Sequence, residues 1–148
     1  MNILTLLGSA RKKGNTATAP GCVQKDDVPA ILEQMTGADL TLFASPLYFW
    51  GVSAQLKAVI DRTYGLYTRY HEADHASLLE GRGQAFLMTG AGGRDNNAEG
   101  AFTAFKRMQN PHKTHYAGEW YIGNCTTPSD MPLSMKETAL NFARQICE

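Results

Sequence analysis

Short apolar runs, each followed by a loop of small residues and then by a helix-like pattern, most constrain the fold of this chain. Ile3–Leu7, Leu40–Ala44 and Gln84–Met88 are such runs, and they are typical of strands buried on both faces of a parallel sheet. Tyr116–Gly123 reads as a fourth strand. Alternating strands and helices predict an α/β fold, with a parallel sheet and helices on both of its faces.

Four helices are predicted between and after these strands, from capping residues and from apolar side chains at helical spacing. They run from Asp26 or Asp27 through Met35, from the cap Ser53 to about Tyr64, from Asn96 or Asn97 through about Met108, and from the cap Ser134 to near Ile146. Gly37 is expected to end the first helix, and Pro111 follows the third. Gly65–Gly83 is predicted as a long, tyrosine-rich connection.

Length and composition narrow the class of protein. The 148 residues suit one domain. With 14 basic and 14 acidic residues, general electrostatics do not favour a nucleic acid or an anionic membrane as partner. No apolar run reaches the roughly 18 residues of a membrane span, and no signal peptide is recognisable. The three cysteines are far apart, which favours a reduced, cytoplasmic protein.

Three of the predicted strands end in loops rich in small or aromatic residues, and such loops meet at one edge of a parallel sheet, where ligands bind. The first loop, Gly8–Thr16, offers backbone N–H groups, hydroxyls and Arg11, which suit a phosphate. It matches neither GxxxxGK[ST] nor GxGxxG, so taken alone it is equally compatible with an ordinary polar turn. The candidate phosphate ligands in it are Ser9, Arg11, Lys13, Gly14, Asn15 and Thr16.

Together the three loops resemble the flavodoxin-like NAD(P)H-dependent FMN reductases and their relatives, the iron–sulfur flavoproteins. The resemblance is carried by GSARKKGNT at 8–16, by AD at 38–39 with SPLYF at 45–49 and SAQLKAVIDR at 53–62, and by TGAGG at 89–93. It covers most of the chain and implies a flavodoxin-like three-layer sandwich, a single FMN-binding domain over residues 1–148, and a homodimer or homotetramer.

The resemblance also implies which residues hold FMN. The first loop would bind the phosphate, and two further loops would border the ribityl chain and the ring: Pro46, Leu47, Tyr48, Phe49, Trp50 and Gly51, and Thr89, Gly90, Ala91, Gly92 and Gly93. Aromatic walls suit a flat apolar ring, and glycines let the backbone approach its edge. For the aromatic residues the alternative is ordinary core packing, and for the glycines it is a plain turn.

The chain departs from the family between Thr16 and Asp26. Gly8 to Ala38 is 31 residues, whereas a helix, a strand and a second helix with their loops need about forty. Four strands are therefore predicted, or five if a segment is missing from the sequence. In a four-stranded sheet, Ile3–Leu7 would be an edge strand. Only Cys22 remains in the region of the iron–sulfur cluster, so no cluster is expected.

The predicted function is transfer of hydride from NAD(P)H through FMN to a small-molecule acceptor such as a quinone or a flavin, with no catalytic side chain and no metal. Two alternatives stay open: a flavodoxin-type electron carrier that does not use NAD(P)H, and a shortened, cofactor-free interaction module. His71, Asp74 and His75 have a metal-like spacing, but no fourth ligand is evident, so a loop or a subunit contact is favoured there.

Overall fold

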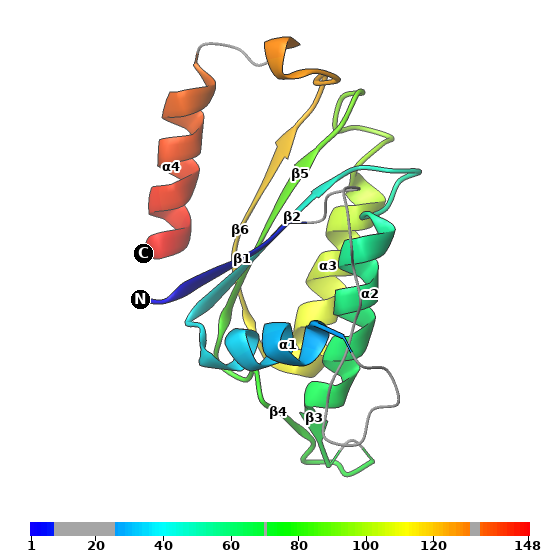
Figure 1. Cartoon of the computed structure of the whole chain (residues 1–148), viewed down its shortest axis with the longest axis vertical. Coiled ribbons are helices and arrows are strands. Elements are labelled where there is room, and N and C mark those ends of the chain that lie inside the picture. The colour runs from blue at the N-terminus through cyan, green and yellow to red at the C-terminus, as the bar shows by residue number, and fades with distance from the viewer. Residues whose placement is uncertain (8–25, 70, 131–133) are drawn as a thin grey trace.

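The fold is a four-stranded parallel sheet between helical layers (Figure 1). The structure is a computed structural model that describes residues 1–7, 26–69, 71–130 and 134–148. Within these ranges the strands of the sheet lie in the order β1-β2-β5-β6 and every neighbouring pair is parallel. Their bounds are β1 Ile3–Leu7, β2 Leu40–Pro46, β5 Gly83–Thr89 and β6 His115–Ile122. The four predicted strands are confirmed: β1 has the predicted bounds, and the ends of the other three shift by no more than two residues.

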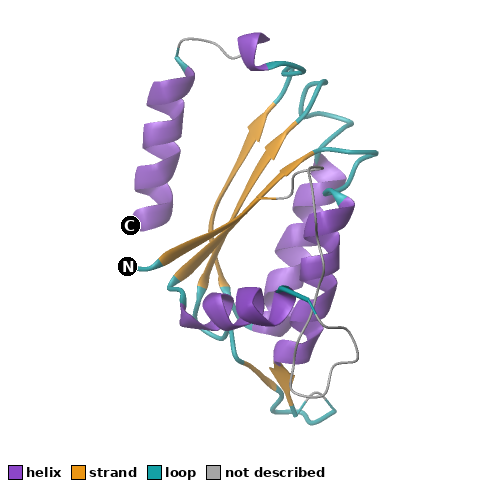
Figure 2. Cartoon of the chain, viewed as in Figure 1, coloured by secondary structure: helices purple, strands orange, loops and turns teal. Residues whose placement is uncertain are grey.

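Among the described residues, the helices α1, α2 and α3 lie on one face of the sheet and α4 lies on the other (Figures 1 and 2). Their bounds are α1 Val28–Gly37, α2 Ala54–Arg62, α3 Glu99–His112 and α4 Met135–Cys147. Each strand pairs with the next large strand along the chain, so right-handed crossovers in one direction place α1, α2 and α3 on the same side. The last described helix, α4, packs on the opposite face of the sheet.

The two faces have unequal cores. On the three-helix side, Phe43 of β2 and Phe86 of β5 are fully buried against α3, where the Phe86 and Phe105 rings stack with centroids 4.6 Å apart. On the other side, Phe142 and Ile146 of α4 pack against β2, β5 and β6. The predicted layers are therefore confirmed, and in the described part of the chain α4 forms the second outer layer.

β1 is an edge strand of the described sheet, as the shortened segment after it predicted. Its Ile3 lies in register with Leu40; Leu40 is buried under α4, but Ile3 is 43% exposed. The helix α4 thus covers the centre of its face and stops short of β1. None of the helices in the described ranges has the length and apolar character needed to cross a bilayer.

The end of α3 differs from the prediction. The helix continues through Pro111 to His112, although the proline has no N–H to donate to the carbonyl four residues earlier. Lys113 then ends it in the left-handed conformation, with φ 54°. At the other end, Glu99 accepts hydrogen bonds from the N–H groups of Asn96 (2.6 Å) and Asn97 (2.9 Å). The Glu99 carboxylate therefore satisfies N–H groups of the turn before the helix, and the N-cap is Ala98 rather than either asparagine.

The long connection after α2 is partly ordered by a buried histidine. It contains a short helix, η1 Thr63–Leu66, and a two-stranded hairpin of β3 Tyr67–Thr68 and β4 Ala76–Ser77. His112 is 1% exposed and lies 2.9 Å from both the Thr63 and the Ser77 hydroxyl oxygens. Burial lowers the pKa of His112 to about 4. The neutral imidazole thus joins α3 to the hairpin, far from the loops at the carboxyl ends of the strands.

Candidate functional site

Two of the three predicted site loops lie side by side at the carboxyl edge of the sheet. Pro46 and Thr89, the last residues of β2 and β5, are in register. One residue further, the Leu47 N–H donates to the Thr89 carbonyl at 2.7 Å. The segments Pro46–Gly51 and Thr89–Gly93 therefore leave the sheet together. The predicted phosphate ligands Ser9, Arg11, Lys13, Gly14, Asn15 and Thr16 lie outside the described residues.

The loop after β2 ends in a strained aromatic turn. Tyr48 and Gly51 exchange two backbone hydrogen bonds, of 2.9 and 3.0 Å. Between them Phe49 has φ 45° and Trp50 has φ 62°, which is the geometry of a type I′ turn that ordinarily favours asparagine and glycine. Phe49 is 95% exposed. These aromatic residues are therefore not core residues, and strain at exposed aromatic side chains is typical of a functional position.

The base of this aromatic turn is fixed by two buried serines. The Ser53 N–H donates to the Ser45 hydroxyl at 2.9 Å, and that hydroxyl donates to the Pro46 carbonyl at 2.8 Å. The Ser53 hydroxyl accepts from the Leu56 N–H at 3.3 Å, so the predicted cap of α2 is confirmed. The two ends of the loop are thus joined below an exposed tip.

The glycine loop after β5 packs tightly against β6. The Gly90 N–H donates to the Ile122 carbonyl at 2.9 Å. A Cβ added at Gly90 would lie 2.4 Å from the Tyr121 hydroxyl and 3.3 Å from Leu47 Cβ. Only a residue without a side chain fits between these two loops without displacing one of them. The packing of this loop against Tyr121 and Leu47 thus requires glycine at position 90.

A third loop, which the prediction missed, completes the same edge. The N–H groups of Asn124 and Cys125, just after β6, donate to the Gly92 and Gly90 carbonyls at 3.2 and 3.0 Å. Tyr121 donates from its hydroxyl to the Gly92 carbonyl at 2.9 Å. This loop could have been predicted from its position after the fourth predicted strand, because all parallel strands end at the same edge of the sheet.

A charged cluster lies beside the glycine loop on the α3 side of β6. The Glu119 carboxylate pairs with Arg94, and with Lys106 at 3.1 Å. Burial raises the pKa of Glu119, but hydrogen bonds from Arg94, Lys106 and Tyr116 outweigh it and leave the pKa below its ordinary value. Glu119 therefore stays ionised and holds Arg94, the residue that follows the loop.

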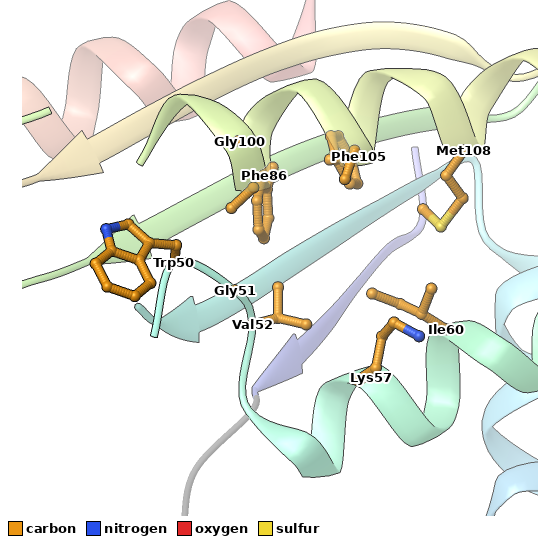
Figure 3. A pocket seen from close by; sticks show the side chains of 11 residues that line it. Trp50, Gly51, Val52, Lys57, Ile60, Phe86, Gly100, Phe105 and Met108 are labelled. Carbon is orange, nitrogen blue, oxygen red and sulfur yellow. The ribbon is translucent and has the colours of Figure 1, made fainter. Parts of the chain in front are cut away.

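An apolar groove of about 320 Å³ opens between α2 and α3, with Trp50 at one end (Figure 3). It contains one charged side chain, Lys57, whose ammonium group pairs with Asp61 at 2.6 Å. The chemistry of the groove therefore suits an apolar group. Its lining residues are Trp50, Gly51, Val52, Lys57, Ile60, Phe86, Gly100, Ala101, Ala104, Phe105 and Met108.

The histidines with metal-like spacing take another arrangement. Asp74, between His71 and His75, pairs with Arg69 in the β3–β4 connection. Within the described part of the chain, no three His, Cys, Asp or Glu side chains are grouped so that they could hold a metal ion. Cys125 and Cys147 are free thiols, and Cys22 lies outside the described residues.

Comparison with curated proteins finds local similarity to iron–sulfur flavoproteins. An iron-sulfur flavoprotein of Methanocaldococcus jannaschii is 52% identical over 42 residues, which are 28% of this chain and 22% of that protein. One of Archaeoglobus fulgidus is 36% identical over 62 residues, which are 42% of this chain and 26% of that protein. The chain thus matches about a quarter of the length of these relatives.

Solved structures share the fold. The Trp repressor binding protein from Bacillus subtilis superposes with a TM-score of 0.70 at 15% identity, over 97% of this chain and 99% of that one. General stress protein 14 from Treponema denticola, solved in complex with FMN, gives 0.58 at 17% identity, over 82% and 72% of the two chains. An NADPH-quinone reductase from P. pentosaceus gives 0.57 at 18% identity, over 80% and 71%.

The family model provides the assignment. The model of the NADPH-dependent FMN reductases matches residues 17–124, a range that contains both described site loops, the groove between α2 and α3, and the strands β2, β5 and β6. The parallel sheet with a flavodoxin-like arrangement of helices is the fold that the sequence motifs predicted. The chain is a member of the NADPH-dependent FMN reductase family.

Proposed function

We propose that this chain is an FMN-dependent oxidoreductase that takes hydride from NAD(P)H and passes it to a small-molecule acceptor. The observation that carries the proposal is the meeting of the Pro46–Gly51 and Thr89–Gly93 loops at the carboxyl edge of the sheet, joined by the Leu47–Thr89 hydrogen bond of 2.7 Å. This is the edge at which open α/β sheets bind ligands, and the chain belongs to a family of FMN reductases.

The described residues fit the ring end of a flavin. The Phe49–Trp50 turn offers aromatic surface to a flat ring. On the other side, Gly92 and Gly93 are exposed and have no side chain, so the backbone there is accessible to a ring edge. The phosphate would be held by Ser9, Arg11, Lys13, Gly14, Asn15 and Thr16, as the sequence motif predicts.

Bound FMN supplies the redox chemistry, accepting hydride from a nicotinamide and giving electrons to an acceptor. The protein's part is placement. The serine pair Ser45 and Ser53 holds the base of the aromatic turn, and Tyr121 holds the glycine loop. No side chain is assigned an acid–base role. The exposure of Phe49 and Trp50 leaves room for a planar co-substrate or acceptor, such as a quinone or a second flavin, to approach.

The proposal is tested by titrating the purified protein with FMN, following quenching of flavin fluorescence, and then measuring NADPH and NADH oxidation with benzoquinone as acceptor. Saturable FMN binding and quinone-dependent oxidation are expected. Arg11→Ala should raise the FMN dissociation constant at least tenfold, because a charge-assisted hydrogen bond is worth about 1.5–3 kcal/mol. Arg107→Ala is the matched control: this arginine is exposed on α3, and FMN binding should not change.

The alternatives predict different results in the same experiment. Bound FMN without oxidation of either nicotinamide would favour a flavodoxin-type electron carrier. No FMN binding by folded wild-type protein would contradict the proposal and favour a cofactor-free interaction module. Equal FMN binding by wild type and Arg11→Ala would contradict the role of Arg11 as a phosphate ligand. It would not contradict the proposed oxidoreductase activity.

We further propose a homodimer or homotetramer. Tyr48, Phe49 and Trp50 are exposed next to the apolar groove between α2 and α3, and an exposed apolar patch of this kind is typical of contact surfaces. Light scattering of wild type against Phe49→Ser tests this assembly. A monomeric wild type at micromolar concentration would refute it.

A further inference from the structure

The carbonyl groups of the glycine loop are held by residues of β6, of the loop after it, and of the turn before α3. The Gly90 carbonyl accepts from the Cys125 N–H at 3.0 Å. The Gly92 carbonyl accepts from the Tyr121 hydroxyl at 2.9 Å, and the Gly93 carbonyl accepts from the Asn97 side-chain amide at 2.9 Å. These three carbonyl groups are thus occupied by hydrogen bonds within the protein.

Tyr121 is central to this arrangement. Its hydroxyl donates to the Gly92 carbonyl and accepts from the Asn97 amide at 3.0 Å. Tyr121 is closely packed against two glycines. A Cβ added at Gly90 would lie 2.4 Å from its hydroxyl oxygen, and a Cβ added at Gly123 would lie 2.9 Å from its ring. The ring also packs edge-to-face on Phe102, with centroids 6.2 Å apart. The hydroxyl is therefore held from several sides, and its direction is defined.

Fixing these carbonyl groups also fixes the N–H groups behind them. In a trans peptide the C=O and the following N–H point in opposite directions, and no cis peptide occurs in the described residues. The N–H groups of Ala91 and Gly93 must then point away from Tyr121 and the loop after β6, and the Arg94 N–H must point away from the Asn97 side chain. Among the hydrogen bonds within the described residues, none uses these three donors. The outer side of the loop therefore presents hydrogen-bond donors.

We propose that Tyr121 is a positioning residue that, together with the Asn124 N–H on the same Gly92 carbonyl, turns the Gly93 N–H of the glycine loop toward the flavin ring and thereby favours reduced FMN over oxidised FMN. This proposal rests on the proposed function, because it needs FMN at this edge of the sheet. Reduction increases the negative charge on the flavin ring, and oriented backbone donors at the edge of a bound ring would stabilise that charge. Asn97 acts with Tyr121, since it bonds both the tyrosine hydroxyl and the Gly93 carbonyl.

The test is the Tyr121→Phe variant, which removes only the hydroxyl. The dissociation constant of oxidised FMN should rise less than threefold, because the phosphate contacts are untouched. The affinity for reduced FMN should fall about tenfold more than that for oxidised FMN. That ratio corresponds to a midpoint potential about 30 mV more negative for a two-electron couple. The potential is measured by equilibration with reference dyes, a readout that a purely structural role would not move.

Two further variants make the result decisive. Tyr116→Phe removes a hydroxyl from the same strand that bonds Glu119 and no carbonyl of the loop, and should leave the potential unchanged. Asn97→Ala keeps Tyr121 and should shift the potential in the same direction, so the proposal is still testable if Tyr121→Phe does not fold. An unchanged potential in both loop variants, with FMN bound, would overturn the proposal. If the wild type binds no FMN, the proposed function itself fails, and this proposal fails with it.

Discussion

The Ser45 hydroxyl accepts a hydrogen bond of 2.9 Å from the N–H of Ser53, eight residues further along the chain. This contact joins the end of β2 to the start of α2 and closes the base of the aromatic loop between them. Both side chains are buried. The exposed Phe49–Trp50 turn is therefore joined to the rest of the fold by a hydrogen bond that is shielded from water.

Ser45→Ala should destabilise the fold by about 1–3 kcal/mol, because it leaves the buried Ser53 N–H without an acceptor. Urea unfolding followed by far-UV circular dichroism measures this. The matched control is Ser134→Ala, where the serine is exposed at the start of α4 and its side chain makes no capping bond. The control should change stability by less than about 0.5 kcal/mol. Equal effects in the two variants would contradict a role for the Ser45–Ser53 contact.

Gly90→Ala should destabilise the protein by about 1–3 kcal/mol, because its Cβ would lie 2.4 Å from the Tyr121 hydroxyl. Tyr121→Phe removes the oxygen concerned, so the double variant should be less destabilised than the sum of the two single variants. A double-mutant cycle from thermal or urea unfolding measures the coupling. Strictly additive effects of Gly90→Ala and Tyr121→Phe would show that the added Cβ is accommodated without involving the Tyr121 hydroxyl. Gly93→Ala is the control, since a Cβ there would meet nothing within 4 Å.

Phe49→Asn and Trp50→Gly should each stabilise the fold by about 0.5–1 kcal/mol, because these residues suit the positive φ angles of 45° and 62°. If the turn borders the flavin as proposed, both variants should also weaken FMN binding. Stability comes from urea unfolding without FMN, and binding comes from fluorescence titration. Lower stability in both variants would show that the aromatic side chains contribute more through packing than the strained backbone costs.

The stability of the protein should fall as the pH drops from about 6.5 to about 4. In the unfolded chain histidine titrates near 6.5, whereas burial lowers the pKa of His112 to about 4 in the folded protein. Between these values the unfolded state binds more protons, so acid favours unfolding, by up to about 3 kcal/mol. Below about pH 4 both states are protonated at this residue, and its contribution does not change further.

Substitution identifies the group responsible for this pH dependence. His112→Gln should flatten the pH dependence of the unfolding free energy in that window, although it also lowers stability at neutral pH. His115→Gln changes an exposed histidine two residues beyond the αL cap and should leave the slope as in wild type. An unchanged slope in His112→Gln would assign the pH dependence to another group.

Glu119→Gln should destabilise the protein by about 1 kcal/mol at low salt, because it leaves the cations of Arg94 and Lys106 near each other without their carboxylate. The effect should shrink at high salt. Since the pKa of Glu119 is lowered in the fold, its contribution is present above its ordinary pKa and is lost as the pH falls through the folded value. Asp61→Asn, at the exposed Lys57 pair, is the control and should change little.

Much of the fold could be predicted because it depends on local pattern. The apolar run Leu40–Ala44 and the small-residue ends of the strands indicated a parallel sheet whatever the details of packing. The capping role of Ser53 was predicted from its place before an amphipathic helix, and the structure confirms it. The bounds of α3 were not predicted: Pro111 lies inside its last turn, where His112 is held by Thr63 and Ser77, residues distant in sequence.

The sequence by itself determined the order of elements, the α/β class and the two loops that end β2 and β5, because periodicity and turn chemistry are local properties of the chain. Only the tertiary structure decided that the aromatic residues at 48–50 are exposed on a strained turn, and that Tyr121 and Asn97 hold the carbonyl groups of the glycine loop. Those facts depend on distances between segments that neighbouring parallel strands bring together, and no local pattern encodes such distances.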